Sequence, residues 1–382
     1  GMPPLRTGDF PVVGVTSYAI WWGIIALGAA VVSHVVFGLR AEVRRARQLG
    51  QYTLEEKLGE GGMGTVYRAR HAMMRRPTAV KLLHPDKAGE AQLARFEREV
   101  QLTAQLTHPN TITIFDYGRT PDGIFYYAME LLDGATLADV VRLDGAQPPG
   151  RVLKVLAEVA SALEEAHGID FIHRDIKPAN VILCRQGGKP DVAKLVDFGL
   201  VKDLAGTEGV ELTATESIAG TPLYLSPEAL SAPETVSARS DLYALGGVGY
   251  FLLTGGHVFS GRTAAEVCGH HLHTAPEAPS ARLGRPVPAD LEALILSCLA
   301  KKASDRPRSA RELRARVQAC TSWGEWSEDD ARAWWREKRE GLRELRQQEV
   351  GSAQEMSIAI DLEGRRAPVK DPVRSDHTLT RP

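Results

Sequence analysis

The most constraining feature of this sequence is the stretch 171–180, which reads Phe-Ile-His-Arg-Asp-Ile-Lys-Pro-Ala-Asn. Asp197-Phe198-Gly199 begins 22 residues after Asp175. Asp175 offers a carboxylate that can orient a hydroxyl group and accept its proton. Asn180 and Asp197 offer amide and carboxylate oxygens, which are the ligands that Mg²⁺ prefers. A base beside two metal-binding oxygen groups is what the transfer of a phosphoryl group to a hydroxyl requires.

Composition bounds the kind of protein that carries this stretch. With 382 residues, 43% apolar and 25% charged, the chain has the length of roughly two domains and can bury a sizeable core. A formal net charge of −2 gives no reason to expect a nucleic-acid partner. The four cysteines are too scattered for a metal site or a disulfide framework, and they suit a reducing cytosol: Cys184, Cys268, Cys298 and Cys320.

The N-terminal region is of a different kind. Residues 11–39 contain no charged side chain, and 19–39 is long enough to cross a hydrocarbon layer of ~30 Å as a helix. Four arginines follow within residues 40–47, against one before the run, which favours a cytoplasmic C-terminal side. We predict a short outer segment at 1–10, a transmembrane helix at 11–39 and a basic connector at 40–51. A cleaved signal peptide and a buried soluble helix are the alternatives.

A glycine-rich stretch follows the connector. Residues 58–66 read Leu-Gly-Glu-Gly-Gly-Met-Gly-Thr-Val, with strand-like residues on both sides. Glycines let a backbone approach phosphates closely, because no Cβ stands in the way. A dinucleotide-binding turn is the alternative, but it requires a helix after the third glycine, whereas a second strand-like run follows here. Next, Thr78 to Leu82 is predicted as a strand with a single lysine, Lys81.

Together these motifs resemble those of the protein kinases, over Tyr52 to about Cys320. The closest resemblance is to bacterial eukaryotic-like (Hanks-type) serine/threonine kinases that are anchored in the membrane. This implies an α+β bilobal fold, with a small lobe of antiparallel strands plus one helix and a large α-helical lobe, as a domain at 52–320. It also implies ATP and Mg²⁺ as cofactors, with Mn²⁺ as an alternative, and proteins as substrates.

The resemblance also implies roles for single residues. Asp175 matches the catalytic base, Lys177 a contact to the transferring phosphate, and Lys81 a contact to the α- and β-phosphates. The partner of Lys81 is expected to be Glu99, with Glu97 as the alternative. Asn180 and Asp197 match the metal ligands. The residues matching the ATP site are Leu58, Gly59, Gly61, Gly64, Val66, Ala79, Lys81, Met129, Glu130, Leu132 and Leu183, of which Met129 matches the gatekeeper and Glu130 and Leu132 the backbone contacts to adenine.

Two further pairings implied by the resemblance are structural. Glu228 is expected to pair with Arg306, and Asp241 to brace the backbone of the catalytic loop. Apolar periodicity or composition predicts helices at 92–106, 151–167, 242–254, 264–271, 290–301 and 310–319. A charged, tryptophan-rich helical tail is predicted at 321–350, either docked on the large lobe or used for a partner. Residues 351–382 are polar and predicted to be disordered.

Regulation by phosphorylation is also predicted. Arg174 precedes the catalytic aspartate, and we expect it to be a buried cation that needs an anionic partner. In related bacterial kinases, threonines matching Thr213 and Thr215 are phosphorylated, and such phosphates would pair with arginine. A homodimer is the expected arrangement for autophosphorylation. The location predicted for the protein is the inner membrane, with the kinase domain in the cytoplasm.

Two other functions fit the same motifs. A pseudokinase scaffold would keep the fold and lose a catalytic residue, yet Lys81, Glu99, Asp175, Asn180 and Asp197 are all in place. A relay at the membrane, in which the kinase module serves a receptor, is compatible with enzyme activity. The sequence names no substrate protein.

Overall fold

The structure is a computed structural model that describes residues 48–49, 51–61, 64–83, 90–120, 124–198 and 222–347. The predictions for residues 1–47, Thr213, Thr215 and 351–382 therefore lie outside the described residues. Within the described part, no helix has the length and apolar character needed to cross a membrane. The chain divides into two units. The first consists of Gly1–Glu56 and Arg68–Pro77, and the second of Lys57–Tyr67 and Thr78–Pro382.

The described part of the first unit is built on strands. β1 (Gln48–Leu49) pairs antiparallel with the start of β2 (Tyr52–Gly61), with Gln48 opposite Thr53. The end of β3 (Gly64–His71) belongs here too, and the ring of His71 meets the ring of Tyr52 edge to face at 5.2 Å. This aromatic contact buries both rings within the unit.

The second unit begins with an antiparallel sheet. Its strand order is β2-β3-β4-β6-β5, where β4 is Pro77–Leu83, β5 is Ile114–Arg119 and β6 is Phe125–Glu130. Helix α2 (Glu90–Thr103) buries Phe96 and Val100, four residues apart and so on one face. These side chains form a small core with Leu83, Phe125 and Tyr127. This sheet and helix make the small lobe of the predicted fold.

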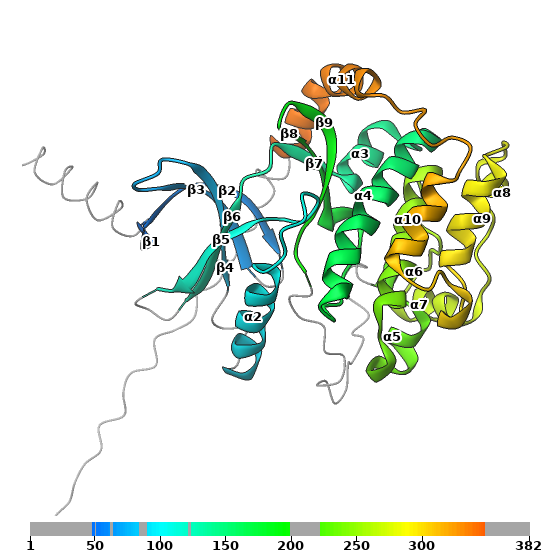
Figure 1. The fold of residues 1–382 in the computed structure, drawn as a ribbon, viewed down its shortest axis with the longest axis horizontal. Coiled ribbons are helices and arrows are strands. Elements are labelled where there is room, and N and C mark those ends of the chain that lie inside the picture. Colours follow the sequence, from blue (N-terminus) through cyan, green and yellow to red (C-terminus); the bar gives the residue numbers. More distant parts are fainter. Residues whose placement is uncertain are drawn as a thin grey trace, which may run out of the picture. The chain divides into compact units, whose positions relative to one another are not determined.

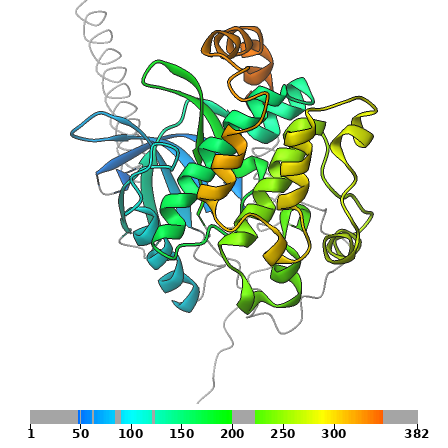
Figure 2. The same ribbon diagram turned by 45° about the vertical axis from the view of Figure 1, so that its right-hand side comes forward.

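The larger part of the second unit is helical (Figure 1). A three-stranded antiparallel sheet, β7-β8-β9, lies beside it. The bounds are β7 Gly134–Thr136, β8 Val181–Gln186, β9 Lys189–Leu195, α3 Leu137–Asp144, α4 Pro149–Gly168, α5 Pro227–Ser231, α6 Ala238–Thr254, α7 Ala264–His273, α8 Pro279–Leu283, α9 Ala289–Cys298, α10 Ala310–Gln318 and α11 Glu328–Glu337. Helices α10, α4, α6 and α9 lie side by side (Figure 2). The helices predicted from the sequence are confirmed to within a few residues at their ends.

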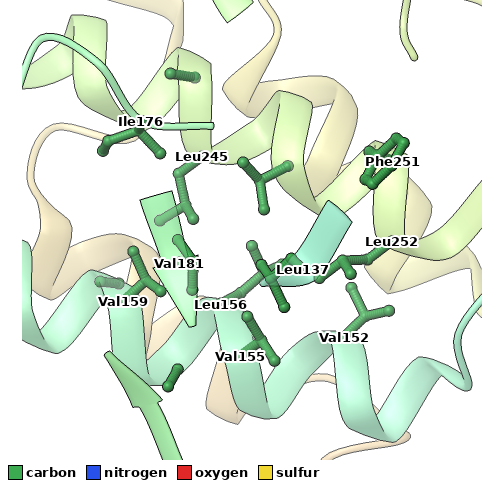
Figure 3. Close-up of a cluster of buried hydrophobic side chains, with 14 of the residues drawn as sticks. Leu137, Val152, Val155, Leu156, Val159, Ile176, Val181, Leu245, Phe251 and Leu252 are labelled. Carbon is green, nitrogen blue, oxygen red and sulfur yellow. The ribbon is translucent and has the colours of Figure 1, made fainter. Parts of the chain in front are cut away.

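One continuous apolar core holds the helical lobe together. Helix α4 is buried along most of its length, because its apolar residues recur at helical spacing. Figure 3 shows Val152, Val155, Leu156 and Val159 of α4 facing side chains of α3, α6 and β8. Ile176, from the stretch 171–180, is in the same cluster and is 1% exposed. The core therefore anchors the catalytic stretch directly.

The tryptophan-rich tail also packs on this lobe. Helix α11 contacts β9, and residues 339–347 continue as a further helical segment. The tail attaches at a buried ion pair of the large lobe, between Arg151 of α4 and Asp191 of β9, whose Nε–Oδ2 distance is 2.8 Å. The indole N–H groups of Trp326 and Trp335 donate to the same Asp191 carboxylate. Of the two alternatives for the tail, the structure shows docking on the large lobe.

Candidate active site

The catalytic loop, residues 171–180, is held by one carboxylate of α6. Asp241 accepts the backbone N–H groups of His173 at 2.8 Å and of Arg174 at 2.9 Å, and His167 Nε2 lies 2.8 Å from it. Arg174 has φ 65°, a left-handed conformation that is uncommon for a residue with a Cβ. The two hydrogen bonds stabilise this conformation. The prediction that Asp241 braces the loop is confirmed.

Three predicted residues of the loop come together around Asp175. Lys177 Nζ lies 2.7 Å from Asp175 Oδ2. Asn180 donates its amide nitrogen to both Asp175 O at 2.8 Å and Asp175 Oδ2 at 2.9 Å. A short 3-10 turn, Pro178–Asn180, gives Asn180 this position. The carboxylate is therefore held in one orientation beside a cation, as a positioned base must be.

Asp197 forms the second centre of the site. Its backbone has φ 55°, and its Oδ1 accepts Lys81 Nζ at 2.7 Å and the Tyr127 hydroxyl at 3.2 Å. Burial alone would raise the pKa of this carboxyl, but the charge of Lys81 and the two hydrogen bonds outweigh it and hold the pKa below its ordinary value. Asp197 is therefore ionised at neutral pH, as a metal ligand requires.

Phe198, the next residue, fixes the direction of the Asp197 backbone. Its side chain is 1% exposed, stacks on the ring of Phe171 at 5.3 Å between centroids and meets the ring of His173 in a tilted contact at 4.5 Å. His173 also lies 3.2 Å from the Val196 carbonyl through its Nε2. The catalytic loop and the segment around Asp197 are thus one packed assembly.

The structure gives a side-chain partner for Lys81, whereas no contact between Lys81 and Glu99 is described. Lys81 forms an ion pair with Asp197. Glu99 lies half-buried on α2, and its carbonyl accepts the Thr103 hydroxyl at 2.8 Å. The Lys81 to Glu99 pair therefore stays a prediction, as does its alternative with Glu97, which pairs with Arg119 at 3.1 Å.

The predicted ATP-binding residues are all in the second unit. Ala79 lies opposite Met129 in the β4–β6 ladder, and Leu183 is buried on β8. The Glu130 N–H donates to the Thr113 carbonyl, and its carboxylate pairs with Lys194 at 2.6 Å. At the end of β6, Leu132 continues the hinge 129–132. Adenine contacts by the backbone of this hinge stay a prediction.

The glycine-rich stretch lies on two strands, as predicted. Leu58, Gly59 and Gly61 lie on β2, and Gly64 and Val66 on β3. A Cβ added at Gly64 would stand 2.1 Å from the carbonyl oxygen of Leu82, so no other residue fits there without a shift of the backbone. Leu58 is 39% exposed, whereas Val66 is half-buried. The glycine at position 64 is explained by close strand packing, independently of any nucleotide.

Two oxygen atoms of the site are available for a metal ion. Asn180 uses its amide nitrogen on Asp175, and Asp197 uses Oδ1 for Lys81 and Tyr127. The amide oxygen of Asn180 and Oδ2 of Asp197 are thus the atoms suited to a hard cation. In the described part of the chain no three His, Cys, Asp or Glu side chains gather as a metal site. These two oxygen atoms fit Mg²⁺, which proteins usually bind through a few side-chain oxygens, with phosphate oxygens and water as the other ligands.

The second predicted structural pair is present. Both terminal nitrogens of Arg306 lie 2.7 Å from the two oxygens of Glu228, which is a bidentate pair. The Ser240 hydroxyl donates to Glu228 as well, at 2.6 Å. The prediction of a bridge between Glu228 and Arg306 is confirmed.

Sequence reasoning missed two polar side chains of the site. Tyr127 donates to Asp197, and Lys194 pairs with Glu130 while being only 1% exposed. Strand alternation was the available signal for Tyr127, because it shares a face of β6 with Met129. The β4–β6 register then places it opposite Lys81.

One premise about Arg174 was wrong. Its side chain is exposed, not buried. The cost of an unpaired buried charge therefore gives no reason for it to seek a partner.

The fold and this site define the chain as a protein kinase. The protein kinase domain family matches residues 52–317, and the chain belongs to that family. It is 38% identical over 273 residues to the serine/threonine-protein kinase pkn3 of Myxococcus xanthus, covering 70% of this chain and 50% of that protein. It is 41% identical over 269 residues to PknB of Mycolicibacterium smegmatis, covering 69% and 42%. The chain thus spans about half the length of these curated relatives, or less.

A solved structure gives the same result for the fold. The crystal structure of the Mycobacterium tuberculosis PknI kinase domain is 31% identical, with a TM-score of 0.56. The match covers 71% of this chain and 96% of that one. The bilobal kinase fold predicted from the sequence is confirmed.

Proposed function

We propose that this protein transfers the γ-phosphoryl group of Mg²⁺-bound ATP to serine or threonine hydroxyls of proteins. The observation that supports it most is the pair of centres in the site, Asp175 held by Lys177 and Asn180, and Asp197 held by Lys81. Lys177, two residues after Asp175, is typical of kinases that act on serine and threonine. The catalytic groups expected from the sequence also argue against a pseudokinase scaffold.

Each residue of the site has a separate role in the proposed phosphoryl transfer. Asp175 orients the acceptor hydroxyl and takes its proton at a carboxylate oxygen, while Lys177 lies beside it to neutralise charge on the transferring group. Asn180 and Asp197 would hold the metal, which neutralises phosphate charge when it is bound. Lys81 would contact the α- and β-phosphates. Catalysis then rests mainly on positioning and charge neutralisation.

An assay with radiolabelled ATP and a generic basic protein acceptor tests the proposal. Asp175→Asn, Asp197→Ala and Lys81→Ala should each leave a folded protein with little activity. The first removes a positioned base, which contributes ~10² to 10⁴-fold, and the other two remove groups that would hold the metal and the phosphates. Thermal melting checks that each variant is folded. A folded Asp175→Asn protein with turnover near that of the wild type would show that Asp175 is not the base.

We further propose regulation by autophosphorylation at Thr213 or Thr215. Arg174 supports this, because its backbone is braced and its exposed guanidinium can donate hydrogen bonds to a phosphate on the activation segment. Mass spectrometry should find phosphate at one of these threonines in the purified protein, and none there in Asp175→Asn. The double alanine variant should be much less active. An unmodified segment in fully active enzyme would reject the regulation and leave the kinase proposal standing.

We also propose that residues 11–39 anchor the protein in the inner membrane, with the kinase domain in the cytoplasm. The support is the uncharged run and the arginines that follow it. The full chain should sediment with membranes and resist carbonate extraction. Recovery of the full chain in the soluble fraction would refute the anchor. We propose in addition that two copies of the protein form a homodimer, in which one copy phosphorylates the other.

A further inference from the structure

A basic cavity lies between the tail and the strands of the second sheet. Its volume is about 620 Å³, within the range of small-molecule sites. Figure 1 shows α11 above β9, which it contacts. Residues of the tail, of β8 and of β9 line the cavity. Its lining residues include six arginines and one aspartate, and they are Asp133, Arg185, Pro190, Arg332, Trp335, Arg336, Arg339, Leu342, Arg343 and Arg346.

Five of the arginines form a stripe on the tail. Arg332 and Arg336 are four residues apart on α11, and the arginines at 339, 343 and 346 are spaced by four and three residues on the helical segment 339–347, so each group shares one face of its helix. Like charges three or four residues apart on a helix repel one another. The stripe therefore costs stability in the absence of an anion.

Carboxylates neutralise only part of this stripe. Arg332 pairs with Glu328 and Asp329, and Arg343 with Glu340, all on the tail itself. Arg336 and Arg339 have no carboxylate within ion-pair distance among the residues that the structure describes. The middle of the stripe thus carries two uncompensated guanidinium groups that line the cavity.

The wall that presents these arginines is rigidly held. The Trp335 indole N–H donates to Asp191, whose carboxylate is also bound by Arg151 in the buried ion pair. Lys338 lies 2.8 Å from Asp144, one turn along the tail. Leu342 is buried, so the helical segment 339–347 is packed as well. The helices that carry the exposed arginines are thus held in place before binding, which lowers the entropy cost of bringing these side chains to one ligand.

We propose that this cavity is a binding site for a small soluble anion that carries two or more phosphate groups. The guanidinium group presents paired donors that match phosphate oxygens, and several lie within one cavity here. Trp335 and Leu342 supply apolar contact for the rest of the ligand. The site is separate from Asp175 and Asp197, and its ligand binds whether or not phosphoryl transfer occurs.

Calorimetric titration of the full chain with inorganic tripolyphosphate, without Mg²⁺, tests the proposal. Arg336→Gln/Arg339→Gln should weaken binding by about tenfold or more, because two guanidinium groups that pair with phosphate oxygens are lost. The matched control is Arg262→Gln/Arg308→Gln, which removes the same charge from exposed arginines elsewhere and should change the affinity less than about twofold. Equal loss in both variants would refute a site.

Further binding measurements distinguish this site from the catalytic site and a small anion from other ligands. Arg336→Lys/Arg339→Lys keeps the charge and loses the paired donors, so it should bind with intermediate affinity. Lys81→Ala should bind like the wild type, and loss of binding there would assign the anion to the catalytic site and refute the proposal. A phosphothreonine peptide and vesicles with phosphatidylglycerol distinguish the ligand's source. Binding of either one in place of tripolyphosphate, abolished by Arg336→Gln/Arg339→Gln, would overturn the assignment to a small anion.

Discussion

Replacement of Glu228 by glutamine should destabilise the kinase domain strongly. The Arg306 side chain is fully buried, and both of its terminal nitrogens bind the Glu228 carboxylate. Glu228→Gln keeps the shape of the side chain and removes the negative charge. It leaves a buried guanidinium without its counter-charge, which is costly because water does not solvate it there.

The magnitude follows from the pKa of Glu228. Burial alone would raise this pKa, but hydrogen bonds from Arg306 and Ser240 and the charge of Arg306 outweigh it and lower the pKa from 4.5 to about 2. At ~1.4 kcal/mol per unit, this difference corresponds to about 3 kcal/mol. Breaking a buried pair costs roughly 3–5 kcal/mol, which agrees. For a domain of this size the expected fall in Tm is roughly 6–12 °C.

Thermal melting of the full chain, followed by circular dichroism, measures the effect. The control is Glu340→Gln, which removes an exposed partner of Arg343 and should cost less than ~1 kcal/mol. Because the pKa of Glu228 is depressed in the folded state, the carboxylate stabilises the fold above pH 4.5 and loses this effect as the pH falls toward 2. The gap between wild type and Glu228→Gln should therefore narrow below pH 4.5. A fall in Tm of less than 1 °C at pH 7 would refute the reasoning.

Three further variants test other contacts. Asp241→Asn should lower kcat by roughly 10 to 100-fold with a small change in Tm, because a neutral amide braces the two loop N–H groups less well; unchanged kcat would contradict this. Tyr127→Phe should lower kcat only a few-fold, since Asp197 keeps its ion pair with a lysine, and steady-state kinetics would show it. Asp191→Asn should loosen the tail, so that limited proteolysis cuts residues 321–347 faster than in the wild type; equal rates would argue against the buried attachment.

Much of the candidate site could be predicted from the sequence, because its residues are close together in the chain. Asp175, Lys177 and Asn180 lie within six residues, and a braced loop of fixed length leaves few ways to arrange them. The helices were predictable for a similar reason, since apolar residues recur at the period of the helix along each element. Pairs distant in sequence, such as Glu228 with Arg306, were expected only through the family resemblance.

The sequence by itself determined the catalytic loop, the glycine-rich strands, the helical lobe and the class of chemistry. Only the tertiary structure decided that Tyr127 binds Asp197, because this depends on which strands are neighbours and in which register. It also decided that the tail docks and that its arginines line a cavity. A charged helix has the same sequence pattern whether it faces water or another element, and contacts with distant residues such as the buried Asp191 on β9 distinguish the two.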